Sequence, residues 1–265
     1  MIRIIVAGAG GRMGRNLVRA IADEGLELTG ATERPGSDLL GTNPGELAGV
    51  AASGILIVDS LKQCQAADVL IDFTLPESSL GHARFAAEAG MRMVVGTTGF
   101  TTTQLHEFKS VLAGNAVVMA ANFSIGVNLA LGLIQRAAGI LDERYDAEII
   151  EAHHKAKVDA PSGTALAMGR AVADGRETDF NEQAVYARHG HTGQRDPGSI
   201  GFSVIRAGDI VGEHTAMFAA AGDRLEIRHI ATDRMTFATG AVRAAKWLKD
   251  QPPGFYDMRD VLEMQ

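Results

Sequence analysis

The sequence is poor in cysteine and in aromatic residues. Cys64 is the only cysteine, and 265 residues include one tryptophan and three tyrosines. A single cysteine excludes an intrachain disulfide and argues against a cysteine-based metal site. This usage fits a reducing compartment. The fold must therefore be held by a hydrophobic core, for which the 46% of hydrophobic residues is ample.

The sequence also lacks a long uninterrupted hydrophobic run. Its longest apolar stretch, residues 116–134, contains Asn122, Ser124 and Asn128, which indicates a buried strand, a loop and a helix rather than a membrane span. The apolar N-terminus, residues 1–7, runs straight into a glycine loop and has no signal-peptide pattern. These features predict a cytoplasmic protein with no membrane partner.

Basic runs are missing as well, and the formal net charge is −7. Nucleic-acid binding needs a positive face, so this composition argues against nucleic acid as the main partner. A local basic pocket for a small anion remains compatible with it. The chain length allows one large or two modest domains.

A glycine-rich loop stands near the start of the chain. Residues 8–14 read Gly-Ala-Gly-Gly-Arg-Met-Gly, between a short apolar run over 2–7 and a helical pattern over 12–22. The spacing is G-x-x-G-x-x-G, and the strict G-x-G-x-x-G pattern would need glycine in place of Met13. Strand, glycine loop and helix are the context of a dinucleotide-binding fingerprint, although a tight turn without a ligand looks similar. The position at the start of a βαβ unit favours phosphate binding.

The second predicted strand, residues 26–32, ends in Glu33 and Arg34. An acidic residue at this place suits the ribose hydroxyls of NAD, and an arginine suits the 2′-phosphate of NADP. Together they suggest that either cofactor is accepted. The alternative is a solvated ion pair at a strand end, which would be favoured without the glycine loop.

Strands and helices alternate through the first half of the chain. Further strands are expected at 55–58, 69–73, 93–95 and 116–119, and helices at 77–89 and 102–112. This alternation predicts an α/β fold with a Rossmann-like, doubly wound parallel sheet. The loops at 96–99 and 120–124 follow strand ends, where they could line the nicotinamide end of a cofactor site or be ordinary turns.

The pattern changes at about residue 125. A helix over 127–141, a strand over 147–151 and a helix over 163–174 precede three β-like runs at 199–206, 210–220 and 225–231. Turn residues at 207–209 and 222–223 predict hairpins, so we expect a second α+β domain with a largely antiparallel sheet. A helix over 237–248 is expected to pack back on the first domain. The predicted domains are 1–125 for dinucleotide binding, 126–234 for substrate binding and oligomerisation, and 235–265 as a returning segment.

Titratable side chains are most concentrated at residues 151–164. His153 could donate or accept a proton near neutrality, since its unperturbed pKa is about 6.5. Lys157 would lie on the same side if the backbone stays extended, where it could hold a carboxylate or act as an acid. The N–H groups of Gly163 and Thr164, at a predicted helix start, would suit a second carboxylate.

Plainer interpretations exist for each of these residues. Lys155 and Lys157 could be a solvated charge run, Ser162 a helix N-cap, and His153 a buried core residue. The adjacent His153 and His154 have the wrong spacing for a helical metal pair, so no metal is expected. Downstream of a dinucleotide fold, the functional interpretation predicts a reductase acting on a small dianionic substrate.

Residues 151–165 closely resemble the signature of the 4-hydroxy-tetrahydrodipicolinate reductase family, formerly called dihydrodipicolinate reductase. The resemblance spans nearly the whole chain. Its other motifs lie at 8–14, 71–74, 96–99, 120–123, 190–193, 206–215 and 255–262.

The resemblance implies a reaction and an assembly. The family reduces (2S,4S)-4-hydroxy-2,3,4,5-tetrahydrodipicolinate, via dihydrodipicolinate, to tetrahydrodipicolinate with NADH or NADPH. This is a step of lysine biosynthesis by the diaminopimelate pathway. The resemblance further implies a cytoplasmic homotetramer assembled through the second-domain sheets.

The resemblance also implies roles for individual residues. His153 would be the proton donor or acceptor and Lys157 the proton donor. The substrate-binding residues would be His154, Gly163 and Thr164. The cofactor-binding residues would be Gly8, Ala9, Gly10, Gly11, Arg12, Met13, Glu33, Arg34, Gly96, Thr97, Thr98, Ala120, Ala121, Asn122 and Phe123.

Two further positions concern the cofactor. Arg234 is another candidate for a cofactor contact, and Leu75 stands where some family members carry a basic residue. An aspartate or sugar dehydrogenase with a similar two-domain plan is the nearest alternative. A redox-sensing nucleotide-binding protein without turnover is another.

Overall fold

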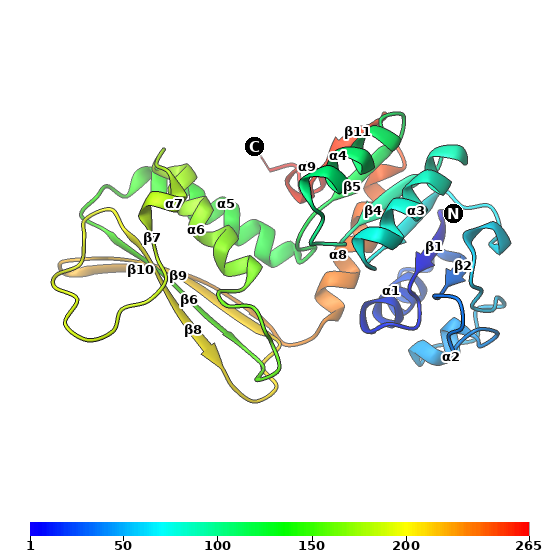
Figure 1. Cartoon of the computed structure of the whole chain (residues 1–265), viewed down its shortest axis with the longest axis horizontal. Coiled ribbons are helices and arrows are strands. Elements are labelled where there is room, and N and C mark those ends of the chain that lie inside the picture. The colour runs from blue at the N-terminus through cyan, green and yellow to red at the C-terminus, as the bar shows by residue number, and fades with distance from the viewer. Residues whose placement is uncertain (265) are drawn as a thin grey trace. The chain divides into compact units, whose positions relative to one another are not determined.

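The computed structural model describes residues 1–264, and the chain divides into two compact units (Figure 1). Unit 1 comprises Met1–Ile125 together with the described residues from Arg234 onward, and unit 2 comprises Gly126–Asp233. Arg234, which the sequence analysis assigned to the second domain, therefore lies in unit 1. Among the described residues, no helix is long and apolar enough to cross a bilayer.

Unit 1 is built on a six-stranded sheet in which every strand pair is parallel. The strand order is β11-β5-β4-β3-β1-β2. The strands are β1 (Arg3–Ala7), β2 (Glu27–Thr32), β3 (Val69–Asp72), β4 (Arg92–Val95), β5 (Ala116–Met119) and β11 (Gly254–Tyr256). This confirms the Rossmann-like α/β fold, in which the carboxyl ends of all six strands share one edge.

Helices cover both faces of this sheet, as its nearly uninterrupted apolar strands require. In β1, Ile4 and Val6 belong to the core formed with α1 and α8, whereas Ile5 and Ala7 belong to the core formed with α3 and α4. The helices of unit 1 are α1 (Arg12–Asp23), α2 (Pro44–Ala48), α3 (Pro76–Glu88), α4 (Thr102–Val111), α8 (Met235–Leu248) and α9 (Met258–Val261), with a 3-10 turn at Leu61–Gln63. The buried face of α8 packs into the core of unit 1.

One predicted strand of unit 1 is wrong. Residues 55–58 form no strand and make only an isolated bridge between Val58 and Thr32. The run is apolar, but its hydrogen bonds go to a loop and a strand end: Ile57 N–H donates to Thr42 O, and Glu33 N–H donates to Val58 O. The segment thus follows the sheet edge without extending it.

Unit 2 contains a five-stranded sheet with α5 (Ile125–Ile140), α6 (Gly163–Gly175) and α7 (Phe180–Gln183). The strand order is β10-β9-β6-β8-β7. The strands are β6 (Asp146–His153), β7 (Ala184–Val185), β8 (Ile200–Arg206), β9 (Gly212–Ala220) and β10 (Asp223–Ala231). The helices pack on one face of the sheet, against alternate strand residues such as Ala147, Ile149 and Phe202.

The sheet is mixed, and the hairpin predicted at residues 207–209 is wrong. β9 and β10 form the predicted antiparallel hairpin, but β8 does not pair with β9. β6 lies between them, parallel to β8 and antiparallel to β9. Residues 207 and 208 instead continue beside the end of β6, where Ala207 N–H donates to His153 O (2.9 Å) and Lys155 N–H donates to Gly208 O (3.2 Å).

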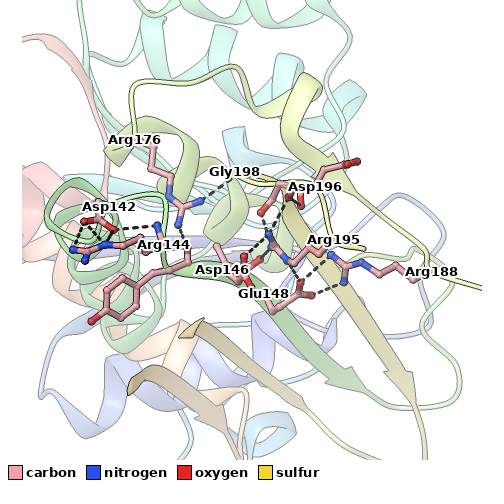
Figure 2. A network of polar contacts seen from close by, with 12 residues as sticks. Asp142, Arg144, Asp146, Glu148, Arg176, Arg188, Arg195, Asp196 and Gly198 are labelled. Carbon is pink, nitrogen blue, oxygen red and sulfur yellow. Dashed lines mark hydrogen bonds and ion pairs between the residues drawn. The ribbon is translucent and has the colours of Figure 1, made fainter. Parts of the chain in front are cut away.

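A polar network ties the long loop before β8 to β6 (Figure 2). Arg195 contacts Asp146 (3.0 Å) and Glu148 (3.1 Å), and Arg188 also pairs with Glu148 (2.9 Å). Because strand residues alternate between faces, Asp146 and Glu148 lie on the face opposite Ala147. We call this side of the sheet, away from the helices, the open face.

Candidate active site

The glycine loop connects β1 to α1. Gly8 has φ +68°, a left-handed conformation that favours glycine, and its carbonyl accepts from Gly11 N–H (3.0 Å). A Cβ on Gly14 would lie 2.1 Å from Gly8 O, so only glycine permits this approach of α1 to the loop. Gly11 caps α1 without a side-chain hydrogen bond, which leaves the first N–H groups of the helix to an anion. The loop therefore fits a dinucleotide pyrophosphate.

Glu33, at the end of β2, reaches over this loop. Its Oε1 accepts from Gly10 N–H (3.0 Å) and its Oε2 from Arg34 N–H (3.2 Å). A cavity of about 520 Å³ lies at this edge of the sheet. Its lining includes Gly8, Thr32, Glu33, Arg34, Lys62, Thr74, Leu75 and His82. Both candidate ribose-end residues therefore line one cavity with Gly8, the first residue of the glycine loop, as a cofactor site requires.

Asp72, at the end of β3, is a buried acid that sequence reasoning missed. Its carboxylate accepts from Thr74 N–H (2.9 Å) and Thr74 Oγ1 (2.6 Å), and lies 2.8 Å from His82 Nδ1. Burial acts to raise the pKa of Asp72, but the bonds from His82 and Thr74 outweigh it, and the pKa lies below its ordinary value. Thr97 Oγ1 joins the group by accepting from Ser79 Oγ (2.8 Å) and Thr74 N–H (3.0 Å). The loops after β3 and β4 are thus fixed to each other.

The loops at 96–98 and 120–123 follow the adjacent strands β4 and β5. Gly96 lies against the Phe73 ring, where a Cβ would come within 2.1 Å of it. Phe123 is buried against the same ring, with centroids 5.2 Å apart. Because the side chains of Thr97 and Phe123 are committed to packing, these loops can offer a ligand mainly backbone groups and the exposed Thr98 and Ala121. Neither loop lines the 520 Å³ cavity.

In unit 2, β6 includes a buried carboxylate, Glu151, which lies two residues before the strand end and is 1% exposed. Arg206 of β8 donates to both carboxylate oxygens at 2.8 Å, and Ser162 N–H donates to Oε1 at 3.0 Å. The fourth hydrogen bond involves His153 Nδ1, 2.5 Å from Oε2. Burial acts to raise the pKa of Glu151, but these hydrogen bonds outweigh it, so the pKa lies below its ordinary value and the group is a carboxylate.

His153 is itself buried, at 8% exposure, and packs edge-on against His214 with ring centroids 5.0 Å apart. Burial lowers the pKa of His153, and the opposing effect of Glu151 does not restore it. Burial, together with the nearby His153, lowers the pKa of His214 to about 4. Both rings are therefore neutral at pH 7. His214 Nε2 lies 2.9 Å from Ser162 Oγ.

The chain turns sharply after His153. Lys157 N–H donates to His154 O (3.1 Å), so the backbone does not stay extended between residues 153 and 157. Lys157 Nζ pairs with Asp159 (2.8 Å) and its side chain is 22% exposed. Lys155 is exposed, in agreement with a solvated charge, and His154 is half-buried.

The start of α6 matches the predicted cap. Ser162 Oγ accepts from Ala165 N–H (3.2 Å), which confirms Ser162 as the N-cap. Gly163 begins the helix and is exposed, and Thr164 is half-buried beside it. Arg234 lies elsewhere, half-buried at the N-cap of α8 in unit 1.

The structure brings together residues that the sequence left apart. Glu151, Arg206 and His214 all surround His153, yet sequence reasoning assigned a role to none of them. Arg206 could have been found only from the parallel pairing of His153 with Arg206, which the predicted hairpin obscured. The result is a neutral imidazole held by a carboxylate beside a lysine and a helix start, which suits proton transfer to an anionic molecule.

No group of three or more His, Cys, Asp or Glu side chains within residues 1–264 is arranged to hold a metal ion.

Comparisons with known proteins cover almost the whole chain. Residues 2–123 match the family model for the N-terminus of dihydrodipicolinate reductase, and residues 126–262 match the model for its C-terminus. A dipicolinate-bound dihydrodipicolinate reductase from Paenisporosarcina sp. TG-14 is 24% identical, with a TM-score of 0.74 over 97% of each chain.

Two more distant structures share the fold. An amine dehydrogenase from Mycobacterium smegmatis is 14% identical with a TM-score of 0.65, covering 96% of this chain and 94% of that one. A myo-inositol dehydrogenase from Corynebacterium glutamicum is 14% identical with a TM-score of 0.59, covering 96% and 90%. At these identities the likeness concerns the fold alone.

Proposed function

The chain belongs to the dihydrodipicolinate reductase family, and from that premise we propose which residues carry out its reaction. The protein is an NAD(P)H-dependent oxidoreductase, the 4-hydroxy-tetrahydrodipicolinate reductase of lysine biosynthesis by the diaminopimelate pathway. The observation that carries the assignment of residues is the buried, carboxylate-held His153 next to Lys157 and the start of α6. Its substrate is a small dicarboxylate, the class to which the dipicolinate of the Paenisporosarcina structure belongs.

The cofactor is held by unit 1. The backbone of Gly8–Met13 binds the pyrophosphate, Glu33 binds the ribose of NADH, and Arg34 binds the 2′-phosphate of NADPH. The loops 96–98 and 120–123 line the nicotinamide end. The left-handed Gly8, the close approach of Gly14 and the shared cavity of Glu33 and Arg34 support this assignment. When bound, the cofactor supplies the hydride for reduction of the substrate.

The substrate is held by unit 2. His153 and Lys157 handle the proton that completes the reduction, His153 at Nε2 and Lys157 at Nζ. His154, Gly163 and Thr164 bind the substrate carboxylates, with the N-terminus of α6 favouring negative charge. Lys157 and the helix start lie on the same short segment as His153, which supports a common ligand for them.

Steady-state kinetics of His153→Gln and Lys157→Met test the assignment. Each change should lower kcat by about 10²- to 10⁴-fold, because each removes a group that moves a proton, while the Kd for NADH stays near that of the wild type. Lys155→Met is the matched control, since Lys155 lies on the same turn but is exposed, and it should retain activity. Wild-type turnover in both test variants would contradict these roles.

We propose that the assembly is a homotetramer formed through the open face of unit 2. This face carries Ile150, Ile205, Met217 and Ile230, which lie outside the core, and Ile205 and Ile230 are each 48% exposed. Such a surface suits burial against another copy. The double change Ile205→Glu and Ile230→Glu should yield smaller species in light scattering, and Ile140→Glu, at an exposed site on α5, should not. A wild-type monomer would refute the proposal.

We also propose that the enzyme works in the cytoplasm. Cys64 is a free, half-buried thiol, and burial raises its pKa, which keeps it in the unreactive protonated form. This state suits a reducing compartment. Recovery of the protein in the membrane or secreted fraction of its native cells would contradict the proposal.

A further inference from the structure

We propose that Glu151 is a positioning residue of the reductase: its carboxylate fixes the tautomer and orientation of His153 and, through Arg206, the turn that carries Lys157. The proposal rests on the proton-handling role proposed for His153.

Glu151 is surrounded by donors. His153 Nδ1 and Arg206 Nη1 lie at Oε2 (2.5 and 2.8 Å), and Arg206 Nη2 and Ser162 N–H donate to Oε1 (2.8 and 3.0 Å). Four bonds to a group that is 1% exposed leave the carboxylate no other orientation. The bidentate arginine sets the plane of the carboxylate, and that plane sets the direction of the bond to the imidazole.

This geometry selects one tautomer of His153. A carboxylate only accepts hydrogen bonds, so the proton of the neutral ring lies on Nδ1 and the lone pair on Nε2. Nε2 faces Gly212, where a Cβ would lie 3.1 Å away. A side chain at position 212 would therefore crowd the reactive nitrogen, and glycine leaves that side of the ring open.

The surrounding charges explain why the carboxylate matters. Burial lowers the pKa of His153, and the cations Lys157 and Arg206 lower it further, whereas Glu151 raises it. His214, the other titratable group packed on the ring, is neutral. Glu151 is thus the single carboxylate among these groups that stabilises the imidazolium, the form His153 passes through whenever Nε2 takes up a proton.

A second connection runs from the same carboxylate to Lys157. Arg206 Nη2 also donates to the backbone carbonyl of Asp159 (2.7 Å), and the Asp159 side chain pairs with Lys157 Nζ (2.8 Å). The buried ion pair of Glu151 and Arg206 therefore positions both proposed proton-handling side chains. It contacts the ring of His153 directly and reaches Lys157 through the turn at Asp159.

The alternative is that Glu151 merely stabilises unit 2, and Glu151→Gln separates the two roles because it keeps volume and an acceptor. We expect kcat to fall at least about 10-fold, as partners that orient a functional imidazole typically contribute 10- to 100-fold, with KM and the Kd for NADH within about twofold. The acid limb of kcat/KM should move to lower pH, because the group that raises the pKa of His153 is lost. Glu148→Gln is the matched control: Glu148 is an ion-paired carboxylate on the same strand but on the open face (Figure 2), and this change should leave kcat and the pH profile unchanged.

A double-mutant cycle with His153→Gln tests whether Glu151 acts through His153. In the His153→Gln background, Glu151→Gln should cost clearly less in kcat than in the wild type, and the remaining loss should come from the turn that carries Lys157. An equal loss in both backgrounds, or an unmoved pH profile, would show a structural role and overturn the proposal. An unimpaired His153→Gln enzyme would overturn the role of His153 itself, whereas a slow His153→Gln enzyme beside a fast Glu151→Gln enzyme would overturn only the role of Glu151.

A measurement on the wild-type protein keeps the proposal testable even if Glu151→Gln fails to fold. Nitrogen-15 NMR of the His153 ring at pH 7.5 should show a protonated Nδ1 and an unprotonated Nε2. The opposite tautomer would overturn the proposal.

Discussion

Replacing Gly14 with alanine would test the cofactor site most directly, because the cost can be worked out from three contacts. The added Cβ would lie 2.1 Å from Gly8 O, 2.6 Å from Ala9 Cα and 2.7 Å from Ala9 C. All three atoms are backbone, so no side chain can rotate away. Contacts under 3.0 Å essentially never occur, so α1 and the glycine loop must separate by about 0.9 Å.

Such a displacement should affect both stability and binding. Overpacking of this kind costs about 1–3 kcal/mol of unfolding free energy. The loop N–H groups move with the backbone, and an error of about 1 Å in a binding geometry can cost on the order of 100-fold. We therefore expect Gly14→Ala to bind NADH about 100-fold more weakly than the wild type. Urea denaturation and fluorescence titration of NADH measure the two quantities.

Gly114→Ala is the matched control for this experiment. A Cβ on Gly114 meets nothing within 4 Å, and Gly114 precedes β5, at the opposite edge of the sheet from the cofactor cavity. It should change neither quantity appreciably. A folded Gly14→Ala protein with NADH affinity within twofold of wild type would refute the assignment of the glycine loop to the pyrophosphate.

Three further outcomes are expected. Arg206→Met should lower the stability of unit 2, measured by hydrogen exchange of β6, by about 3 kcal/mol, because Glu151 loses its charge partner. The double change Arg206→Met and Glu151→Met should recover most of this stability, and no recovery would contradict the explanation. Acidification from pH 6.5 to 4 should destabilise unit 2 by up to about 3 kcal/mol, because His214 is protonated near pH 6.5 in the unfolded chain and only near pH 4 in the folded chain. In urea titrations, His214→Gln should make the unfolding free energy depend less on pH over this range. Leu75→Arg should tighten NADPH binding severalfold at low salt, because it adds a cation to the cavity that holds Arg34, and an effect that persists in 1 M salt would contradict an electrostatic origin.

Local signals were sufficient for most of unit 1. The run over residues 2–7, the glycines of 8–14 and the following helix are adjacent in sequence, so each element constrains the next. The Ser162 cap was predictable for the same reason, since it contacts Ala165 three residues away. The failure at 55–58 shows the limit, because an apolar run beside a sheet need not hydrogen-bond as a strand.

Pairing between distant residues could not be predicted. The residues of 207–209 resemble a turn, but no local feature states that β6 lies between the strands they connect. Without that pairing, the contact between Arg206 and Glu151, which lies 55 residues earlier in the chain, could not be predicted either. Lys157 was misplaced for a smaller reason, because the bond from its N–H to His154 O turns a segment that the sequence allowed to be extended.

The division of unit 1 between two stretches of sequence has a consequence for synthesis. Its core includes Ala238, Ala241, Ala244, Ala245 and Leu248, all fully buried on α8. Gly240 lies against the backbone of Phe123, where a Cβ would come within 1.8 Å of the carbonyl oxygen. The first 125 residues therefore leave the ribosome with one face of their sheet only partly covered, by α1 without α8.

Unit 2 is complete in sequence once residue 233 has been made, before α8 exists. A chain growing from its N-terminus can thus complete the inserted unit while the unit that encloses it still lacks α8, β11 and α9. Translation of unit 1 thus begins first, but unit 1 is completed last. A ribosome that stops before Met235 releases a complete unit 2 joined to a unit 1 that lacks α8, β11 and α9, exposed to proteases and chaperones.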